Sequence, residues 1–223
     1  MPSAAVPATT SRGLRAERKR QAILDGARQE FLSHGYAATS MDRIARAAHV
    51  SKATVYSHFA DKKALFRALT EQMVGERLSE LFGSSPGQSL PPDPAAALTE
   101  LAARCLARRP AQPPFLSLLR LVIGESERFP ELARTFVAQL ERTGVAQVVH
   151  LFEALPAGPE AELRARVFMG ALVHLILMQD LLHGREVAPV DRQAYAAVLV
   201  KLVQAGSDGG QSTNSPPENR HPL

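Results

Sequence analysis

The sequence is poor in aromatic side chains and in cysteine. Tryptophan is absent, aromatic residues make up 5% of the 223 residues, and Cys105 is the single cysteine. One cysteine excludes an intramolecular disulfide and a zinc site built on several cysteines, and it is typical of a reducing compartment. No apolar run approaches the ~18 residues of a transmembrane helix, and the N-terminus lacks the basic-then-apolar pattern of a signal peptide. We therefore expect a cytoplasmic protein without a membrane span.

What the chain does contain favours helices. Hydrophobic residues make up 45% and charged residues 22%, close to the usual globular composition. Alanine and leucine are plentiful, and both favour helix over sheet. Apolar residues recur at helical spacing through most of the chain, and no alternating segment calls for a strand. The sequence predicts an all-α fold.

Proline and glycine divide the chain into helical segments. Long helices are expected over residues 15–34, 95–109, 114–128, 130–154, 159–183 and 191–205, with another that is capped by Asp61 and continues through Leu81. Shorter helices follow the capping residues Thr39, Ser40 and Ser51. The predicted domains are a disordered arm at 1–13, a helix-turn-helix domain at 14–62, a helical ligand-binding and dimerisation domain at 63–205, and a disordered tail at 206–223.

Positive charge is concentrated in the first third of the chain. Residues 1–70 hold 12 basic and 5 acidic side chains, a balance of +7, whereas residues 71–223 hold 14 and 17, a balance of −3. A basic cluster at residues 12–20 leads into the first helix. This asymmetry is typical of a nucleic-acid-binding end, although a solvated charged surface is the plainer alternative because many soluble domains show the same imbalance.

The most specific motif is the segment 39–59, in which a three-residue turn joins two short helices. This is the pattern of a helix-turn-helix, whose second helix enters the major groove of DNA. The stretch 21–65 resembles the TetR family in four places. These are Gly35-Tyr36 after an apolar helix, T-S-x-x-x-I-A-x-x-A-x-V-S at 39–51, T-V-Y-x-H-F at 54–59 and K-x-x-L at 62–65. Ala53 stands where many members have glycine. The segment LRLVIGESERFPELARTF (119–136) resembles the ligand domain of the AcrR/AefR-like branch.

Nine residues are predicted to contact DNA, from their positions and from this resemblance. They are Thr39, Ser40, Arg43, Lys52, Ala53, Thr54, Tyr56, His58 and Lys62. The first three residues of the second helix lie closest to the bases, where lysine can donate to guanine and small side chains can touch a thymine methyl. Tyr56 and His58 match the family's pair of phosphate contacts, and helix N-termini favour phosphate. Each residue has a plainer reading, in which Tyr56 packs and the Thr39-Ser40 pair only caps a helix.

The resemblance also implies a homodimer and a small-molecule effector. In the family the last two long helices form the dimer interface, which predicts contacts at Val167, Gly170, Ala171, His174, Leu175, Leu182, Tyr195, Val198 and Leu202. The middle helices would enclose a cavity for an apolar or amphipathic effector. Its candidate lining is Arg104, Phe115, Leu119, Arg120, Ile123, Phe136 and Met178. The expected function is a transcriptional repressor that leaves a palindromic operator in double-stranded DNA when the effector binds.

Two other classes of function are weaker. A helical-bundle enzyme could use Arg120 with Glu125, or His174, but no coherent acid-base or metal constellation supports it. The G-x-S-x-G match at 83–87 lies in a proline-rich linker rather than between a strand and a helix, so it does not predict a nucleophile. A helical adaptor that binds protein through its N-terminal end is disfavoured by the basic charge there. We expect no catalytic residue, metal or cofactor.

Overall fold

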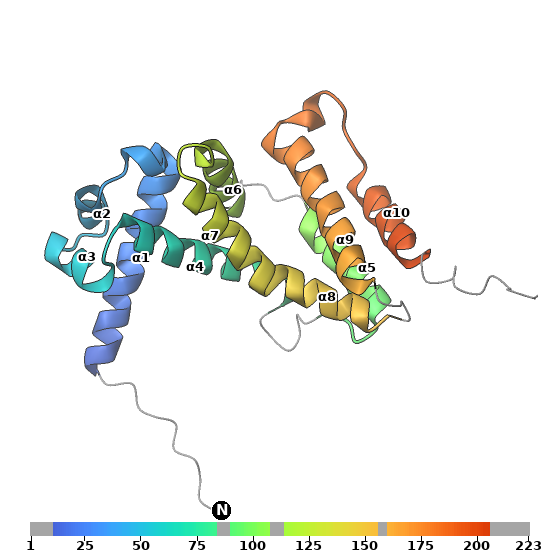
Figure 1. Ribbon diagram of the computed structural model, residues 1–223, viewed down its shortest axis with the longest axis horizontal. Coiled ribbons are helices and arrows are strands. Elements are labelled where there is room, and N and C mark those ends of the chain that lie inside the picture. Colours follow the sequence, from blue (N-terminus) through green and yellow to red (C-terminus); the bar gives the residue numbers. More distant parts are fainter. Residues whose placement is uncertain (1–10, 84–89, 108–113, 156–159, 206–223) are drawn as a thin grey trace, which may run out of the picture. The chain divides into compact units, whose positions relative to one another are not determined.

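The computed structural model describes residues 11–83, 90–107, 114–155 and 160–205, and these residues form helices, turns and loops without a strand (Figure 1). The predicted tail at 206–223 and residues 1–10 of the predicted arm lie outside them. The chain divides into two compact units. The first unit comprises residues 1–80 and 109–144, and the second comprises 81–108 and 145–223. The domain boundary predicted after residue 62 falls inside the first unit. None of the described helices is both long and apolar enough to cross a membrane.

The first unit contains the helix-turn-helix and the helices packed on it. Its elements are α1 (Ser11–Ala38), α2 (Met41–Ala47), α3 (Lys52–His58), α4 (Lys62–Phe82, of which the last two residues belong to the second unit), α6 (Pro114–Glu125) and α7 (Pro130–Leu140). We call α1 to α3 the head. Helix α1 packs on α2, and α2 packs on α3. Helix α6 also packs on α1, so residues 114–144 are fastened to the N-terminal helices.

Helix α1 begins earlier than the sequence pattern predicts. The predicted arm ended at residue 13, but Ser11, Arg12 and Gly13 are already helical. Buried apolar residues between Ile23 and Phe31 anchor the helix, and adding a few residues to an existing helix costs less than starting a new one. At the other end Gly35 interrupts the helix with φ 80°, ψ 166°, a left-handed backbone that glycine adopts most readily.

Four aromatic rings form the centre of the first unit, in a chain that has few. Phe31 stacks on Tyr36 at a centroid distance of 5.5 Å, and Phe66 of α4 meets both rings edge-on at 5.6 and 5.4 Å. Phe129, which immediately precedes α7, meets Tyr36 at 5.1 Å. Such aromatic pairs contribute ~0.5–1.5 kcal/mol each beyond the burial of their area. The rings join the end of α1, α4 and the α6–α7 connection.

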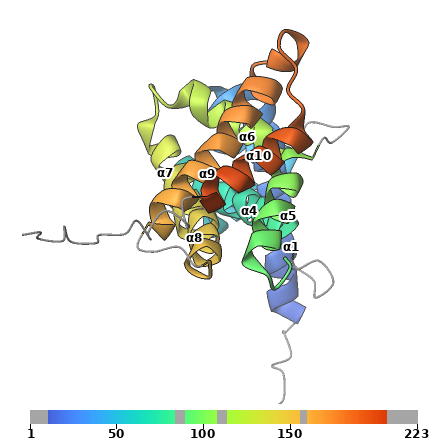
Figure 2. The same cartoon turned by 90° about the vertical axis from the view of Figure 1, so that its right-hand side faces the viewer.

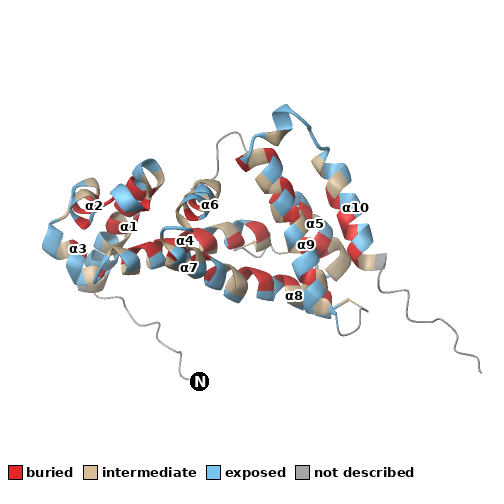
Figure 3. Ribbon diagram, turned by 45° about the horizontal axis from the view of Figure 1, so that its top comes forward, coloured by how far each residue is buried: buried red, intermediate tan, exposed pale blue. Residues whose placement is uncertain are grey.

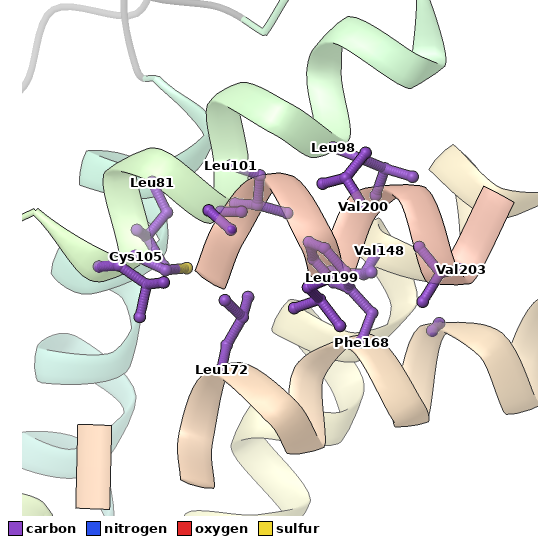
Figure 4. Packing of buried hydrophobic residues seen from close by; sticks show 14 of the residues in the cluster. Leu81, Leu98, Leu101, Cys105, Val148, Phe168, Leu172, Leu199, Val200 and Val203 are labelled. Carbon is purple, nitrogen blue, oxygen red and sulfur yellow. The ribbon is translucent and has the colours of Figure 1, made fainter. Parts of the chain in front are cut away.

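The second unit is a four-helix core. Its helices are α5 (Pro94–Leu106), α8 (Ala146–Glu153), α9 (Ala161–Ile176) and α10 (Arg192–Ala205). Helices α9 and α10 lie side by side, and α5 packs against both (Figures 1 and 2). The buried cluster includes Leu98, Leu101, Phe168, Leu172 and Leu199 (Figure 4). Each such side chain stabilises the fold by ~1.5–3 kcal/mol relative to exposure.

Two wide helical turns interrupt helices that were predicted as continuous. Residues Glu141–Val145 (η1) between α7 and α8, and Leu177–Leu181 (η2) after α9, are π-helical. A short 3₁₀ turn, η3 (Gly184–Glu186), follows. In η2, Asp180 forms an ion pair with Arg192 of α10, and Gln179 bonds the backbone at Ala188 and Val190. The π turn therefore fastens the connection between α9 and α10.

Candidate DNA interface

Side-chain caps set the geometry of the helix-turn-helix. The Ser40 hydroxyl accepts a hydrogen bond from the Arg43 amide at 3.3 Å, and the Ser51 hydroxyl accepts one from the Thr54 amide at 3.1 Å. Between the helices His49 has φ 53°, which turns the chain sharply. The Val50 amide then returns to the Ala45 carbonyl at 3.0 Å. Each serine satisfies one of the free amides at its helix start, and the Val50 bond fixes the turn, so a short α3 is held in one orientation on α2.

Gly26 is a residue of the head that the sequence pattern did not single out. It lies in the interior of α1 and is buried, and a Cβ atom there would lie 2.9 Å from the Ala48 backbone nitrogen at the end of α2. The close approach of α1 to α2 thus depends on the absence of a side chain. An isolated glycine within a strong helix pattern was the available signal.

We expect Gly26→Val to lower the free energy of unfolding by about 2–3 kcal/mol, because the new side chain must displace backbone at the α1–α2 contact. The matched control is Gly75→Ala in α4, where a Cβ atom would meet nothing within 4 Å. That control should raise stability by ~0.5–1 kcal/mol through helix propensity. Denaturant unfolding of both variants checks this, and equal stability of the two would contradict the packing role of Gly26.

Helix α3 carries five of the nine predicted contacts, and three of these five residues are exposed (Figure 3). Lys52 and Ala53 are exposed, Tyr56 is 47% exposed, and Val55 between them is fully buried against the head. The Lys52 ammonium lies 2.9 Å from the Asp42 carboxylate of α2. The hydrogen bond to Asp42, together with its charge, raises the pKa of Lys52. Lys52 is therefore fully charged at neutral pH, and its ammonium group is positioned by Asp42 on the same surface.

Three other residues predicted to contact DNA use their side chains to bond groups of the protein itself. The Thr39 side chain is 2% exposed, and its hydroxyl donates to the carbonyls of Glu30 and Gly35 at 3.1 and 2.8 Å. The Arg43 guanidinium pairs with the largely buried Glu30 carboxylate at 2.7 Å. The Thr39 side chain closes the end of α1, whereas Ser40 beside it is exposed.

Lys62 is the third of these residues. Its ammonium donates to the carbonyls of Tyr36 and Thr39 at 2.8 and 2.9 Å and lies 4.3 Å above the Tyr36 ring. Burial lowers the pKa of Lys62, and the Glu125 carboxylate opposes that shift. Lys62 thus joins the start of α4 to the α1–α2 connection. His58, at the end of α3, is half-buried beside Phe59.

Comparison with known proteins identifies this architecture. Residues 23–69 match the family model described as bacterial regulatory proteins, tetR family. Residues 96–204 match the C-terminal domain of AefR-like transcriptional repressors. The HTH-type transcriptional repressor Rv1474c of Mycobacterium tuberculosis is 34% identical over 190 residues, which cover 82% of this chain and 90% of that protein. The chain belongs to the TetR family.

Other TetR-family proteins agree over most of the chain. The regulator AcrR of Shigella flexneri is 28% identical over 204 residues, covering 84% of this chain and 90% of AcrR. A TetR-family regulator of known structure from Mesorhizobium loti is 25% identical, with a TM-score of 0.66 over 86% of this chain and 97% of that one. The predicted family, its AefR-like branch and the all-α architecture are confirmed. This TetR-family chain is a DNA-binding transcriptional regulator and not an enzyme.

The predicted dimer residues lie mostly on one exposed apolar face of the second unit. On α9, Val167, Gly170 and His174 are exposed, and on α10 Val198 and Leu202 are 56% and 68% exposed. Leu182 is also exposed, while Ala171 and Tyr195 are half-buried and joined by a 3.0 Å hydrogen bond from the tyrosine hydroxyl. Leu175 is wrongly placed in the predicted set, because it is 4% exposed and belongs to the core cluster.

A groove of 540 Å³ runs between α9 and α10 along this face. Its apolar lining includes Leu163, Val167, Val198 and Leu202. Leu163 is exposed and was not in the predicted set. Its position one helical turn before Val167 was the available signal.

The predicted effector residues are divided between the two units. In the first, the Phe115 and Phe136 rings lie 5.9 Å apart, Leu119 is half-buried, and Arg120 and Ile123 are exposed. In the second, Met178 is exposed. Arg104 pairs with Glu100 at 2.9 Å and donates to the Leu81 carbonyl at 3.0 Å. Those bonds give Arg104 a structural role.

A cavity of 760 Å³ in the second unit contains none of the predicted effector residues. It is bounded by α5, the η2–α10 connection and α10, with Thr99, Ala103, Leu106 and Arg185 among its lining residues. Its volume is within the range that binds small molecules.

Proposed function

We propose that this TetR-family regulator acts as a homodimeric repressor that a small-molecule effector releases from a palindromic operator. The observation that carries the proposal is the direct contact, inside the first unit, between the end of α6 and the last turn of α1 in the head. Transcriptional control requires access to the chromosome, so the proposed place of action is the cytoplasm.

The dimer is supported by the exposed apolar face of α9 and α10. Soluble monomers rarely expose a contiguous apolar surface of this kind without a binding role. A face made of two neighbouring helices can pair with its own copy about a two-fold axis, which is the commonest symmetry of soluble oligomers. Two heads related by that axis would read two half-sites about one helical turn apart, and such an operator is palindromic.

The coupling route is supported by contacts at Glu125 and Phe129. A Glu125 carboxylate oxygen accepts a hydrogen bond from the Ala37 amide at 3.3 Å, and the same oxygen would lie 3.2 Å from a Cβ atom at Gly35. The Phe129 ring meets Tyr36, whose carbonyl accepts from Lys62. A shift of α6 would therefore act on the segment that precedes α2. Allosteric proteins typically couple two sites with ~1–3 kcal/mol, or about 5- to 150-fold in affinity.

The proposed effector is a small apolar or amphipathic molecule. Helix α6 presents half-buried and exposed apolar side chains, and the 760 Å³ cavity of the second unit has a mainly apolar lining. A ligand that binds the folded state raises its stability by about 2.7 kcal/mol at a concentration 100 times its Kd. Thermal-shift screening of a library of small amphipathic molecules can therefore find candidates before the operator sequence is identified. Ala103→Trp, which fills the cavity, tells whether a hit binds there.

The test measures operator affinity with and without each stabilising compound, on a duplex recovered by selection from a random library. Compounds that stabilise the free protein should weaken operator binding by about 5- to 150-fold. Glu125→Ala should retain the compound yet lose most of this response, because the carboxylate contact with the head is gone. If saturating compounds leave operator affinity unchanged, effector release is wrong.

A further inference from the structure

The N-terminal turns of α1 carry a basic surface that the nine predicted contacts do not include. Arg15, Arg18 and Lys19 are exposed, and their spacing of three and four residues places them on one side of the helix. Within the described part of the chain none of the three pairs with a carboxylate, whereas Glu17 pairs with Arg20 at 3.7 Å. Their charge is therefore uncompensated on this side of the helix.

These three cations lie across a groove from α3, the second helix of the helix-turn-helix. The groove has a volume of 450 Å³, and Arg15, Ala16, Arg18 and Lys19 of α1 line one wall. Thr54, Ser57 and His58 of α3 line the other. Its lining contains no acidic side chain, and every lining residue except Ala16 can donate a hydrogen bond. Thr54 and His58 belong both to this groove and to the predicted DNA contacts, so the groove continues the predicted interface.

We propose that this groove holds the DNA phosphate backbone beside the major groove that α3 enters. The major groove is about 12 Å wide, so a helix within it is flanked by phosphate strands. A strand that passes between α3 and α1 would meet three cations on one side and hydroxyl or imidazole donors on the other. The inference rests on the DNA-binding role of the head and extends it to α1, which supplies affinity rather than sequence selection.

The test is the full-length variant Arg15→Gln/Arg18→Gln/Lys19→Gln, since glutamine keeps helix propensity close to that of arginine and lysine. Binding is measured from low to moderate KCl on two probes, a duplex selected from a random library and a scrambled duplex of equal length. Each phosphate contact contributes at most about 0.9 to the slope of log affinity against log salt. Three cations in each of two heads predict a slope that is shallower by about 2–5 and an affinity about 10- to 100-fold lower at ~0.1 M salt. Both probes should lose affinity by similar factors.

The matched control is Arg134→Gln/Arg142→Gln/Lys201→Gln, which removes the same charge at exposed positions outside the groove. The control variant should keep most of the wild-type slope of log affinity against log salt. A single Arg18→Gln variant, with an expected slope change of about 1–2, gives the same answer if the triple variant has a lowered melting temperature.

Two results would overturn the inference. One is a slope equal to that of the control variant. The other is an affinity loss confined to the selected duplex, because this would mean that α1 reads bases. Failure of the wild-type protein to bind either duplex would instead contradict the DNA-binding role on which the inference rests.

Discussion

A Leu202→Glu variant is expected to be monomeric and to bind the selected operator about 10²- to 10⁴-fold more weakly than the wild-type protein. Leu202 is 68% exposed and lines the apolar groove between α9 and α10. A glutamate at the centre of a self-paired face would bury two like charges, which is costly without partners. Loss of the dimer removes the gain that comes from linking two heads, typically about 10²–10⁴-fold. Sedimentation velocity and operator titration measure the two effects.

Two further variants sharpen that test. Val167→Glu places the same charge in the groove from α9, and it should act like Leu202→Glu. Gln193→Glu is the control in the absence of effector, because Gln193 lies on α10 and lines the 760 Å³ cavity rather than the groove. Helical geometry puts it about 180° around the helix from Leu202. A Leu202→Glu protein that stays dimeric and keeps its operator affinity would contradict the proposed interface.

A Tyr56→Ala variant is expected to bind operator about 10²- to 10⁴-fold more weakly while it keeps its melting temperature. The Tyr56 residue lies on α3 and is 47% exposed. A hydrogen bond to a charged group contributes ~1.5–3 kcal/mol, and the variant removes one such phosphate contact from each head. Because the Tyr56 ring is not part of the buried core, its removal should lower the folding stability only slightly.

Two comparisons separate the phosphate contact from packing. Tyr56→Phe keeps the ring and lacks the hydroxyl, so it should reproduce most of the binding loss. Tyr36→Ala removes a buried ring from the aromatic centre and should lower stability by about 3–5 kcal/mol. A large fall in the melting temperature of Tyr56→Ala would mean that Tyr56 belongs to the core instead.

The helix-turn-helix could be predicted from the sequence because local interactions determine it. The hydroxyls of Ser40 and Ser51 cap the amides three residues later, and this spacing is visible in the sequence. The buried positions Ile44 and Val55 follow from helical periodicity. The resemblance to the family motif was used to predict which residues contact DNA. The comparisons confirm the family and the fold.

The remaining features depend on contacts between residues distant in the sequence. Lys62 bonds the carbonyls of Tyr36 and Thr39 across 26 and 23 residues, so its motif position did not reveal that role. Leu175 was assigned to the dimer face because α9 is apolar on several sides, and only packing against α5 and α10 shows which side is buried. The π turn at Leu177–Leu181 shifts the periodicity of the helix, which a pattern of regular spacing cannot show.

We propose that a dimer of this TetR-family chain reads a palindrome through α3. Selection from a randomised duplex library by the purified full-length protein, at near-physiological salt and followed by sequencing, tests it most directly. We expect enrichment of an inverted repeat whose half-site centres lie about one helical turn apart, and loss of that enrichment for Leu202→Glu. Recovery of no enriched sequence by a folded, dimeric protein, or of a single half-site without symmetry, would contradict it.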